Sequence, residues 1–483
     1  MDNKPFEVPG RFNSAEEYFK SREALISAEL KLGYEGRAER NPVEVEVEKI
    51  VQHIKSWEER HHYGVHDDGS GYEAGHRFLH TRDAIEKSRL YEIARKAPKG
   101  ALLHCHFDSM ISPYLLLDDA RKQSRLYIKC DVPLVSEGLF ASALPLFSVQ
   151  PDDRGGLTET ENVFSRNYVA GSWMEYSEFL RLFPGGLERA EAWITKRMVL
   201  GPLDAYHPSQ TVNGIWKKFI RSISVARSLL CYETAYRENF RRILWLCARE
   251  GIIYVEIRVA LGYMFTISSD DGTRQHSQSD MMQMFVDILE EEVPKIRSAG
   301  FTFYGAKVIY GCLRSADKEA MQWCMDNCLE LKKKFPGLIC GRVSHMRYLG
   351  DIGFDMQGQE DNGHSLAFFI PELLAMRSKA DSMGLDLPFI FHAGETLDHG
   401  GETDSNLYDA ILLGTKRIGH GFSIAKHPLL MQLCKERNIA IETCPISNEI
   451  LGLCPTTKAH HLPILLSNCV PCTINSDDPG SWR

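Results

Sequence analysis

The stretch Phe389-Ile-Phe-His-Ala-Gly-Glu395 is an apolar run that ends in a histidine and, three residues later, a carboxylate. Apolar, aromatic and β-branched residues followed by small ones predict a buried strand that breaks into a loop. In barrel enzymes, the catalytic groups lie where such strands end. The stretch therefore predicts a strand whose end carries His392 and Glu395 into a site.

Seven more apolar runs alternate with helical patterns along the chain. The expected strands are residues 101–105, 252–259, 301–310, 350–356, 388–392, 417–422, 439–443 and 470–475. Eight strands separated by helices predict an α/β fold of the TIM (β/α)8 barrel class, which we assign to residues 98–483. A doubly wound sheet would require a glycine-rich phosphate-binding turn after its first strand, and the sequence has none there.

Residues 1–97 predict a helical extension before the barrel. Ser14 begins a capping box ahead of one amphipathic helix, and Asn41-Pro42 begins a second one. A third helix is expected over residues 82–96. The first two helices fit equally well an extra layer packed on the barrel or an arm that forms a homodimer. The apolar stripe of the first helix consists of Tyr18, Leu25, Ile26 and Leu30.

Three segments depart from a plain barrel. Far more chain than one βα unit needs lies between the first two strands, and its loop-rich part, about 132–208, predicts an insertion that covers the site or meets a partner. Residues 341–351 predict an added loop or unspliced sequence. The sequence ends soon after Pro479, so we expect the C-terminal helix over the last strand to be missing and the protein to be less stable than complete relatives.

The composition limits the classes of partner. The chain has 483 residues, of which 43% are hydrophobic, and a net charge of −9, so it can bury a large core but has no electrostatic reason to bind phosphate backbones. No stretch has the length and apolarity of a membrane span. The N-terminal residues lack the pattern of a signal peptide, and the thirteen cysteines lack the spacing of a disulfide framework. We therefore expect a cytoplasmic protein with neither nucleic acid nor membrane as a partner.

The sequence His104-Cys-His106 follows the first expected strand. Side chains two residues apart on a strand point to the same face, so the two imidazoles converge while Cys105 faces away. This geometry can chelate a metal ion. On its own, the pattern also fits two histidines with no metal.

Polar residues gather at the ends of the other expected strands. Three imidazoles and a carboxylate among them suit zinc, with a water molecule in the remaining position. The full set is His104, His106, Gly358, Glu360, Asp361, His392, Glu395, His420, Asp477 and Asp478.

Five motifs resemble the adenosine deaminase family, and within it the adenosine deaminase-related growth factor branch. The resemblance covers the chain from about residue 82 to its end, and the motifs follow the order of the family. They are Pro98-Lys-Gly-Ala-Leu-Leu-His-Cys-His-Phe-Asp108, Gly353-Phe-Asp-Met-Gln-Gly-Gln-Glu-Asp-Asn-Gly-His-Ser-Leu366, His392-Ala-Gly-Glu395, Arg417-Ile-Gly-His-Gly421 and Asn475-Ser-Asp-Asp-Pro479. Members of that branch are commonly secreted and have a disulfide in the inserted region, which this sequence does not predict.

The resemblance implies one zinc ion per chain and a role for each residue around it. Glu395 would donate a proton to N1 of the purine, while His420 and Asp478 would orient and deprotonate the attacking water. Asp478 would also contact N7. The implied zinc ligands are His104, His106, His392 and Asp477.

Substrate contacts also follow from the resemblance. The backbone N–H of Gly358 would bond N3 of the purine, and Asp108 would meet the ribose 5′-hydroxyl. Trp216 resembles an aromatic residue over the ribose, although it also fits a helix core. Glu256 and Arg258 lie on one face of the second strand and predict an interior ion pair.

The implied activity is hydrolytic deamination of adenosine, and of 2′-deoxyadenosine, to inosine and ammonia. The alternatives are an aminohydrolase acting on adenine or AMP, or a catalytically weakened binding or signalling relative. An acidic Asp108 would repel the phosphate of AMP, and an adenine enzyme would not need a ribose contact.

Overall fold

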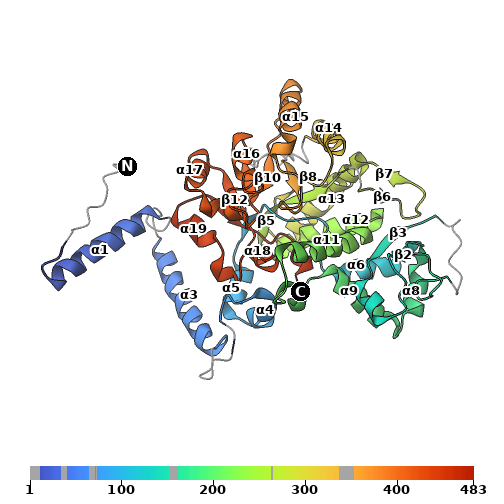
Figure 1. Ribbon diagram of the computed structural model, residues 1–483, viewed down its shortest axis with the longest axis horizontal. Coiled ribbons are helices and arrows are strands. Elements are labelled where there is room, and N and C mark those ends of the chain that lie inside the picture. Colours follow the sequence, from blue (N-terminus) through green and yellow to red (C-terminus); the bar gives the residue numbers. More distant parts are fainter. Residues whose placement is uncertain are drawn as a thin grey trace.

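The computed structural model describes most of the chain, namely residues 11–33, 41–64, 71, 73–151, 161–262, 265–336 and 353–482. The expected loop at 341–351 lies outside the described residues. Figure 1 shows a helix-covered barrel with two N-terminal helices at its periphery. Within the described residues, no helix is both long and apolar enough to cross a membrane.

Eight parallel strands form the barrel, and each overlaps a stretch that the sequence predicts as strand. They are β1 (Gly100–Leu102), β5 (Ile252–Ala260), β8 (Gly305–Leu313), β9 (Phe354–Gln357), β10 (Ile390–Ala393), β11 (Arg417–His420), β12 (Ala440–Thr443) and β13 (Cys472–Ile474). Hydrogen bonds order them as β1-β5-β8-β9 and β10-β11-β12-β13. Single bridges, from Phe354 to Phe389 and from Cys105 to Asp477, join the two sheets at both edges. The predicted TIM (β/α)8 barrel is confirmed.

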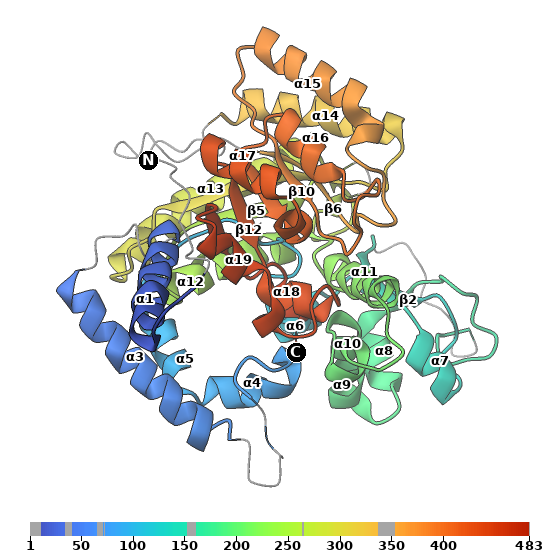
Figure 2. The ribbon, with the colours of Figure 1, turned by 60° about the vertical axis from the view of Figure 1, so that its left-hand side comes forward.

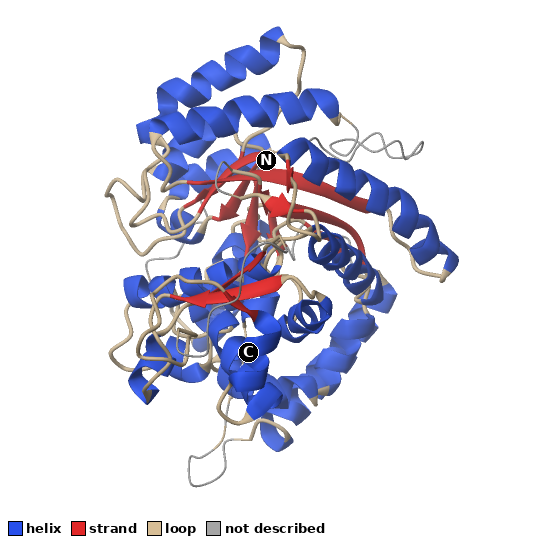
Figure 3. Ribbon diagram, turned by 90° about the vertical axis from the view of Figure 1, so that its right-hand side faces the viewer, coloured by secondary structure: helices blue, strands red, loops and turns tan. Residues whose placement is uncertain are grey.

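Helices surround the strands (Figure 3). Buried apolar residues of the helices and strands form one hydrophobic core cluster. Two of the longer helices begin at side-chain caps, since Ser277 and Asp280 form a capping box and the Asp317 side chain accepts the N–H of Ala320. The helices are α6 (Pro113–Lys122), α11 (Val212–Leu229), α12 (Glu233–Arg249), α13 (Gln278–Ser298), α14 (Lys318–Lys334), α15 (Ile370–Ser382), α16 (Asn406–Leu412), α17 (Pro428–Arg437), α18 (Pro445–Ile450) and α19 (Leu462–Ser467), with 3₁₀ turns at Ala367–Phe369, Phe422–Lys426, Thr457–Ala459 and Pro479–Ser481.

The N-terminal extension contains α1 (Ala15–Leu32) and α3 (Pro42–His61), which begin at the predicted caps Ser14 and Asn41. Figure 2 shows both helices outside the ring of barrel helices. The side chains of the predicted α1 stripe are between 42% and 53% exposed. No described residue therefore covers this stripe fully.

The single helix expected over 82–96 is wrong, because the chain forms α4 (Phe78–Glu86) and α5 (Arg89–Lys96) instead. Ser88 starts the second helix by accepting the N–H of Tyr91, and it donates its own hydroxyl to the buried carboxylate of Glu58 on α3. A serine within a helical pattern was thus an N-cap that the periodicity alone did not reveal.

Apart from residues 152–160, which lie outside the described residues, the stretch expected to be loop-rich contains helices and strands as well as loops. β2 (Leu126–Cys130) pairs in antiparallel fashion with β3 (Pro145–Val149) and β4 (Met174–Glu175). Its strands are short and partly outside the 132–208 window, which is why turn residues dominated the pattern. The accompanying helices are α7 (Glu137–Ser142), α8 (Tyr176–Leu182), α9 (Gly186–Met198) and α10 (Pro202–Ala205), and a further hairpin pairs β6 (Ile267–Ser268) with β7 (Gln275–His276).

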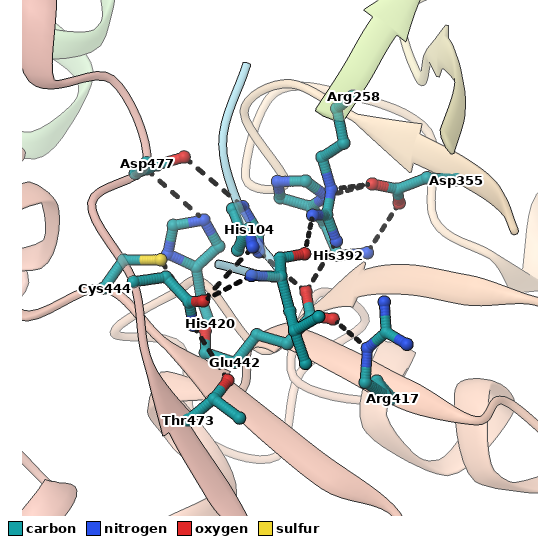
Figure 4. A network of polar contacts seen from close by, with 12 residues as sticks. His104, Arg258, Asp355, His392, Arg417, His420, Glu442, Cys444, Thr473 and Asp477 are labelled. Atoms are coloured by element: carbon teal, nitrogen blue, oxygen red, sulfur yellow. Dashed lines mark hydrogen bonds and ion pairs between the residues drawn. The ribbon is translucent and has the colours of Figure 1, made fainter. Parts of the chain in front are cut away.

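Charged side chains fill the interior of the barrel near its carboxyl end (Figure 4). Arg258 is fully buried, and its guanidinium bonds Asp355 at 2.7 Å and Glu442 at 2.7 Å. Glu256 pairs with Arg417 instead. The expected pair between Glu256 and Arg258 is therefore wrong, because inward side chains of a barrel meet those of other strands rather than those of their own.

We expect Arg258→Met to lower the free energy of unfolding by about 3–5 kcal/mol, because two buried carboxylates would lose their shared cation. Chemical denaturation measures this change. The matched control is Lys96→Met, which breaks the exposed pair with Glu92 and should leave stability unchanged. Equal stability of the two variants would contradict the role assigned to Arg258.

Candidate active site

Four residues that the sequence selects as zinc ligands meet at the carboxyl end of the barrel. Nε2 of His104 and Nε2 of His106 lie 3.3 and 3.1 Å from Oδ1 of Asp477. The ring of His392 lies 4.7 Å from that of His104, centre to centre. Asp477 has a φ of 57°, a left-handed conformation that is unusual for a residue other than glycine. Such backbone strain at a cluster of polar groups is typical of functional sites.

Two buried carboxylates orient the histidines from behind (Figure 4). Nδ1 of His104 donates to Glu442 at 2.9 Å, and Nδ1 of His392 donates to Asp355 at 2.7 Å. Each bond directs Nε2 toward the centre of the site, as in metal sites where a carboxylate fixes the ring. The sequence analysis missed both carboxylates, although a charged residue inside an otherwise apolar strand was the available signal.

The cluster fits a divalent cation. Within the described residues, ligand atoms of His104, His106 and His392 lie within 4.8 Å of one another. Nε2 of His104 and Oδ1 of Asp477 are buried and have no hydrogen-bond partner among the described residues. Burial lowers the pKa of His392 to about 4, so its imidazole is neutral. The neutral imidazole of His392 and the unsatisfied Nε2 of His104, beside a carboxylate, belong to the donor set that zinc prefers.

Asp477 is ionised in this environment. Burial alone would raise its pKa, but the nearby imidazoles of His420, His104 and His106 lower it well below its usual value. Cys444 also lies within reach of the cluster, yet burial, with the nearby Asp477, raises the pKa of its thiol well above the usual value. Cys444 is therefore a neutral thiol and a poor metal ligand.

Glu395 lies beside the cluster as a buried carboxyl. Burial first, and then the charges of Asp477 and Glu360, raise its pKa well above the usual value. The backbone N–H groups of Gly394 and Glu395 donate to Glu360 at 3.1 and 2.6 Å, and Asn406 donates to the same carboxylate. The strand end is thus fixed, and the carboxyl can carry a proton near neutral pH.

His420 and Asp478 also lie beside the cluster, and Nδ1 of His420 is 3.3 Å from Oε1 of Glu395. Nδ1 of His420 contacts the side-chain nitrogen of Asn448 at 3.0 Å, and its Nε2 lies 3.7 Å from Asp477. Ser109 donates to Asp478, whose pKa is raised by burial and by the charge of Asp477. The neighbouring acids therefore differ in protonation, which is how one site can hold both a proton donor and a charged ligand.

A cavity of about 290 Å³ opens above these groups. All the residues with a predicted catalytic, substrate-binding or zinc-binding role line it except His104, which is completely buried beneath it. Gly358 has a φ of 102° and open space where a Cβ would lie, so a ligand can approach its backbone closely. Trp216 is 5% exposed and packs on Phe219 at 5.5 Å, so it belongs both to a core cluster and to the cavity wall.

Two cationic residues that line this cavity, Arg227 and Arg314, were not predicted from the sequence. Arg227, in the last turn of α11, forms an ion pair with Asp108 through Nε. No signal in the sequence links the two, because α11 lies outside the strand-and-helix repeat that places the other residues.

Comparison with known proteins by sequence finds adenosine deaminases. A family model described as adenosine deaminase matches residues 202–482. An adenosine deaminase of Aedes albopictus is 30% identical over 476 residues, which cover 98% of this chain and 79% of the relative, and human adenosine deaminase 2 is 28% identical over 84% of this chain and 71% of its own length. A solved Arabidopsis structure in complex with GMP aligns with a TM-score of 0.49 at 17% identity, over 81% of this chain and 83% of that one.

The curated relatives named adenosine deaminase 2 bear out the predicted branch. The chain is accordingly an enzyme, a hydrolytic deaminase. Its family model covers more than half of its length. From its motifs, its barrel and these matches together, the chain belongs to the adenosine deaminase family.

Proposed function

We propose that this enzyme is zinc-dependent and converts adenosine, and 2′-deoxyadenosine, to inosine and ammonia. The observation that carries the proposal is the buried carboxyl of Glu395, whose pKa is raised by burial and which lies in one cavity with His106, His392 and Asp477 of the cluster. Deamination at C6 of a purine needs a proton donor for the ring and an activated water, and these two sets of groups match the two needs.

His104, His106, His392 and Asp477 would hold one zinc ion. When bound, zinc supplies Lewis-acid activation of water at neutral pH. Glu395 keeps its proton until the purine N1 accepts it, because burial disfavours the charged carboxylate. His420 and Asp478 orient the attacking water and take part in its deprotonation.

The other end of the cavity would hold the nucleoside. The backbone N–H of Gly358 would bond N3, Asp108 would accept the 5′-hydroxyl, and Trp216 would lie against the ribose. The cavity continues past the polar cluster to the wall formed by α11, which gives a ribose a place to bind. This extension favours a nucleoside over free adenine.

AMP is the second candidate substrate, because of one observation. The sequence argument against AMP assumed that Asp108 carries an uncompensated charge, but Arg227 neutralises it. The repulsion of a 5′-phosphate is therefore weaker than expected, and AMP belongs in every assay of the wild-type enzyme.

A homodimer through the N-terminal arm (α1 and α3) stays part of the proposal. The support is the apolar stripe of α1, which remains about half exposed. We also propose a cytoplasmic location, for which the support is that every described cysteine is a free thiol.

Replacing Glu395 by glutamine should reduce kcat/KM for adenosine by about 10²–10⁴-fold, since the amide cannot give up a proton to N1. Conversion of adenosine to inosine, followed by absorbance, measures the change. Glu436→Gln, on the exposed face of α17, is the matched control and should retain full activity. Activity of Glu395→Gln within a few-fold of wild type would refute the donor role.

Removing metal with a chelator should abolish turnover, and adding Zn²⁺ should restore it, because three imidazoles and a carboxylate match its preferred donor set. Elemental analysis of the purified protein should find about one zinc per chain. Undiminished turnover by metal-free protein would rule out zinc dependence. If another ion and not Zn²⁺ restores turnover, that ion is assigned to the site instead of zinc.

The double substitution Leu25→Asp/Ile26→Asp should convert a dimer to a monomer, because it places two charges in an apolar contact. Light scattering during gel filtration gives the mass. Leu412→Asp, at an 80% exposed position on α16, controls for added charge. If the arm variant keeps the mass of the wild type, the arm does not form the dimer.

A further inference from the structure

The ribose end of the cavity contains an ion pair that the proposed function leaves unexplained. Arg227 donates from Nε to Oδ2 of Asp108, and both side chains line the cavity. The Asp108 side chain is 8% exposed and that of Arg227 is 26% exposed. An ion pair shielded to this degree holds its geometry better than one on the open surface.

The pair leaves one carboxylate oxygen available. Within the described residues, no hydrogen bond reaches Oδ1 of Asp108, and none is formed by the two terminal nitrogens of Arg227. The Arg227 guanidinium also lies 5.7 Å from the ring centre of Phe265, which limits its movement. Asp108 is thus held by one oxygen while the other can accept a hydrogen bond.

We infer that Arg227 is a positioning residue that holds Asp108 ready to accept the 5′-hydroxyl of the nucleoside, and thereby sets specificity for that hydroxyl. The inference rests on the proposed function, because it requires a nucleoside in the cavity. Without Arg227, the Asp108 carboxylate could rotate about its side-chain bonds. Part of the free energy of the hydrogen bond with the 5′-hydroxyl would then be spent on ordering the carboxylate when the nucleoside binds.

The location of Arg227 on α11 supports this role. The cavity face of the helix begins with Trp216 and Phe219, continues through Ser224 one turn before its end, and finishes with Arg227. The apolar residues form the wall, and the only cation on this face of α11 meets the acid at its end. A purely structural role, such as favourable placement of a cation in the last turn of a helix, would not depend on the substrate.

The test compares two substrates that differ only in the 5′-hydroxyl, adenosine and 5′-deoxyadenosine. Arg227→Met should lower kcat/KM for adenosine about tenfold, chiefly through KM, as expected when a charge-assisted hydrogen bond is misplaced. Turnover of 5′-deoxyadenosine should change by less than about twofold. Arg227→Lys should recover part of the loss, because it keeps the charge.

A second comparison uses Asp108→Asn. Adding Arg227→Met to this variant should cause no further loss, since Arg227 acts through the Asp108 carboxylate. Equal losses on both substrates, or additive losses in the double variant, would overturn the inference. A thermal melt of each variant shows whether it folds, and Arg227→Lys carries the test if Arg227→Met does not.

Turnover of AMP distinguishes the positioning role of Arg227 from a role in binding an anionic substrate. If Arg227→Met leaves adenosine unaffected and lowers only AMP turnover, Arg227 is an anion-binding residue and the positioning role is refuted. If the wild-type enzyme deaminates neither adenosine nor 5′-deoxyadenosine, the proposed function itself is refuted. The role of Arg227 in recognition of the 5′-hydroxyl is then refuted as well.

Discussion

The buried guanidinium of Arg258 is the interaction on which the site depends. It bonds Asp355 and Glu442, and each of these carboxylates also accepts the Nδ1 proton of a site histidine. Burial of a lone carboxylate would raise its pKa and leave it neutral, but Arg258 keeps the pKa of both acids well below their usual range. The ionised carboxylates can then fix the rings of His104 and His392.

This arrangement explains why so many charges lie inside the barrel. Burying an unpaired ion costs several kcal/mol by order of magnitude, so each carboxylate there needs a cation and each cation needs full hydrogen bonding. In the layer below, Arg417 forms ion pairs with Glu256 and Glu442 in the same way. The barrel interior therefore acts as a rigid polar support, and its apolar packing lies between the strands and the helices.

A second consequence is the division of protonation among three neighbouring acids. Asp477 has imidazoles on two sides, which lower its pKa, whereas Glu395 and Asp478 have burial and the charge of Asp477, which raise theirs. One ionised acid thus favours the protonated form of the two others. The proposed division between a metal ligand and a proton donor follows from these positions and needs no unusual residue type.

The sequence could predict the parts of the molecule that repeat, and it failed where contacts join distant segments. Apolar runs between helical patterns predicted all eight strands, and alternation within a strand predicted the convergence of His104 and His106, because a strand has only two faces. It paired Glu256 with Arg258, since nothing in a single strand reveals which side chains reach in from the others.

Only one partner of the contact between Arg227 and Asp108 could be placed from the sequence. Asp108 belongs to a strand end, where the barrel repeat places it, whereas Arg227 comes from α11, which reaches the cavity from outside that repeat. Strand ends supply the groups proposed for chemistry, while α11 supplies a wall and one cation near the proposed ribose position. The groups proposed to meet fixed atoms of the purine thus lie on the barrel, whereas the proposed ribose end combines Asp108 from a strand end with a helix whose sequence can change without disturbing the strands.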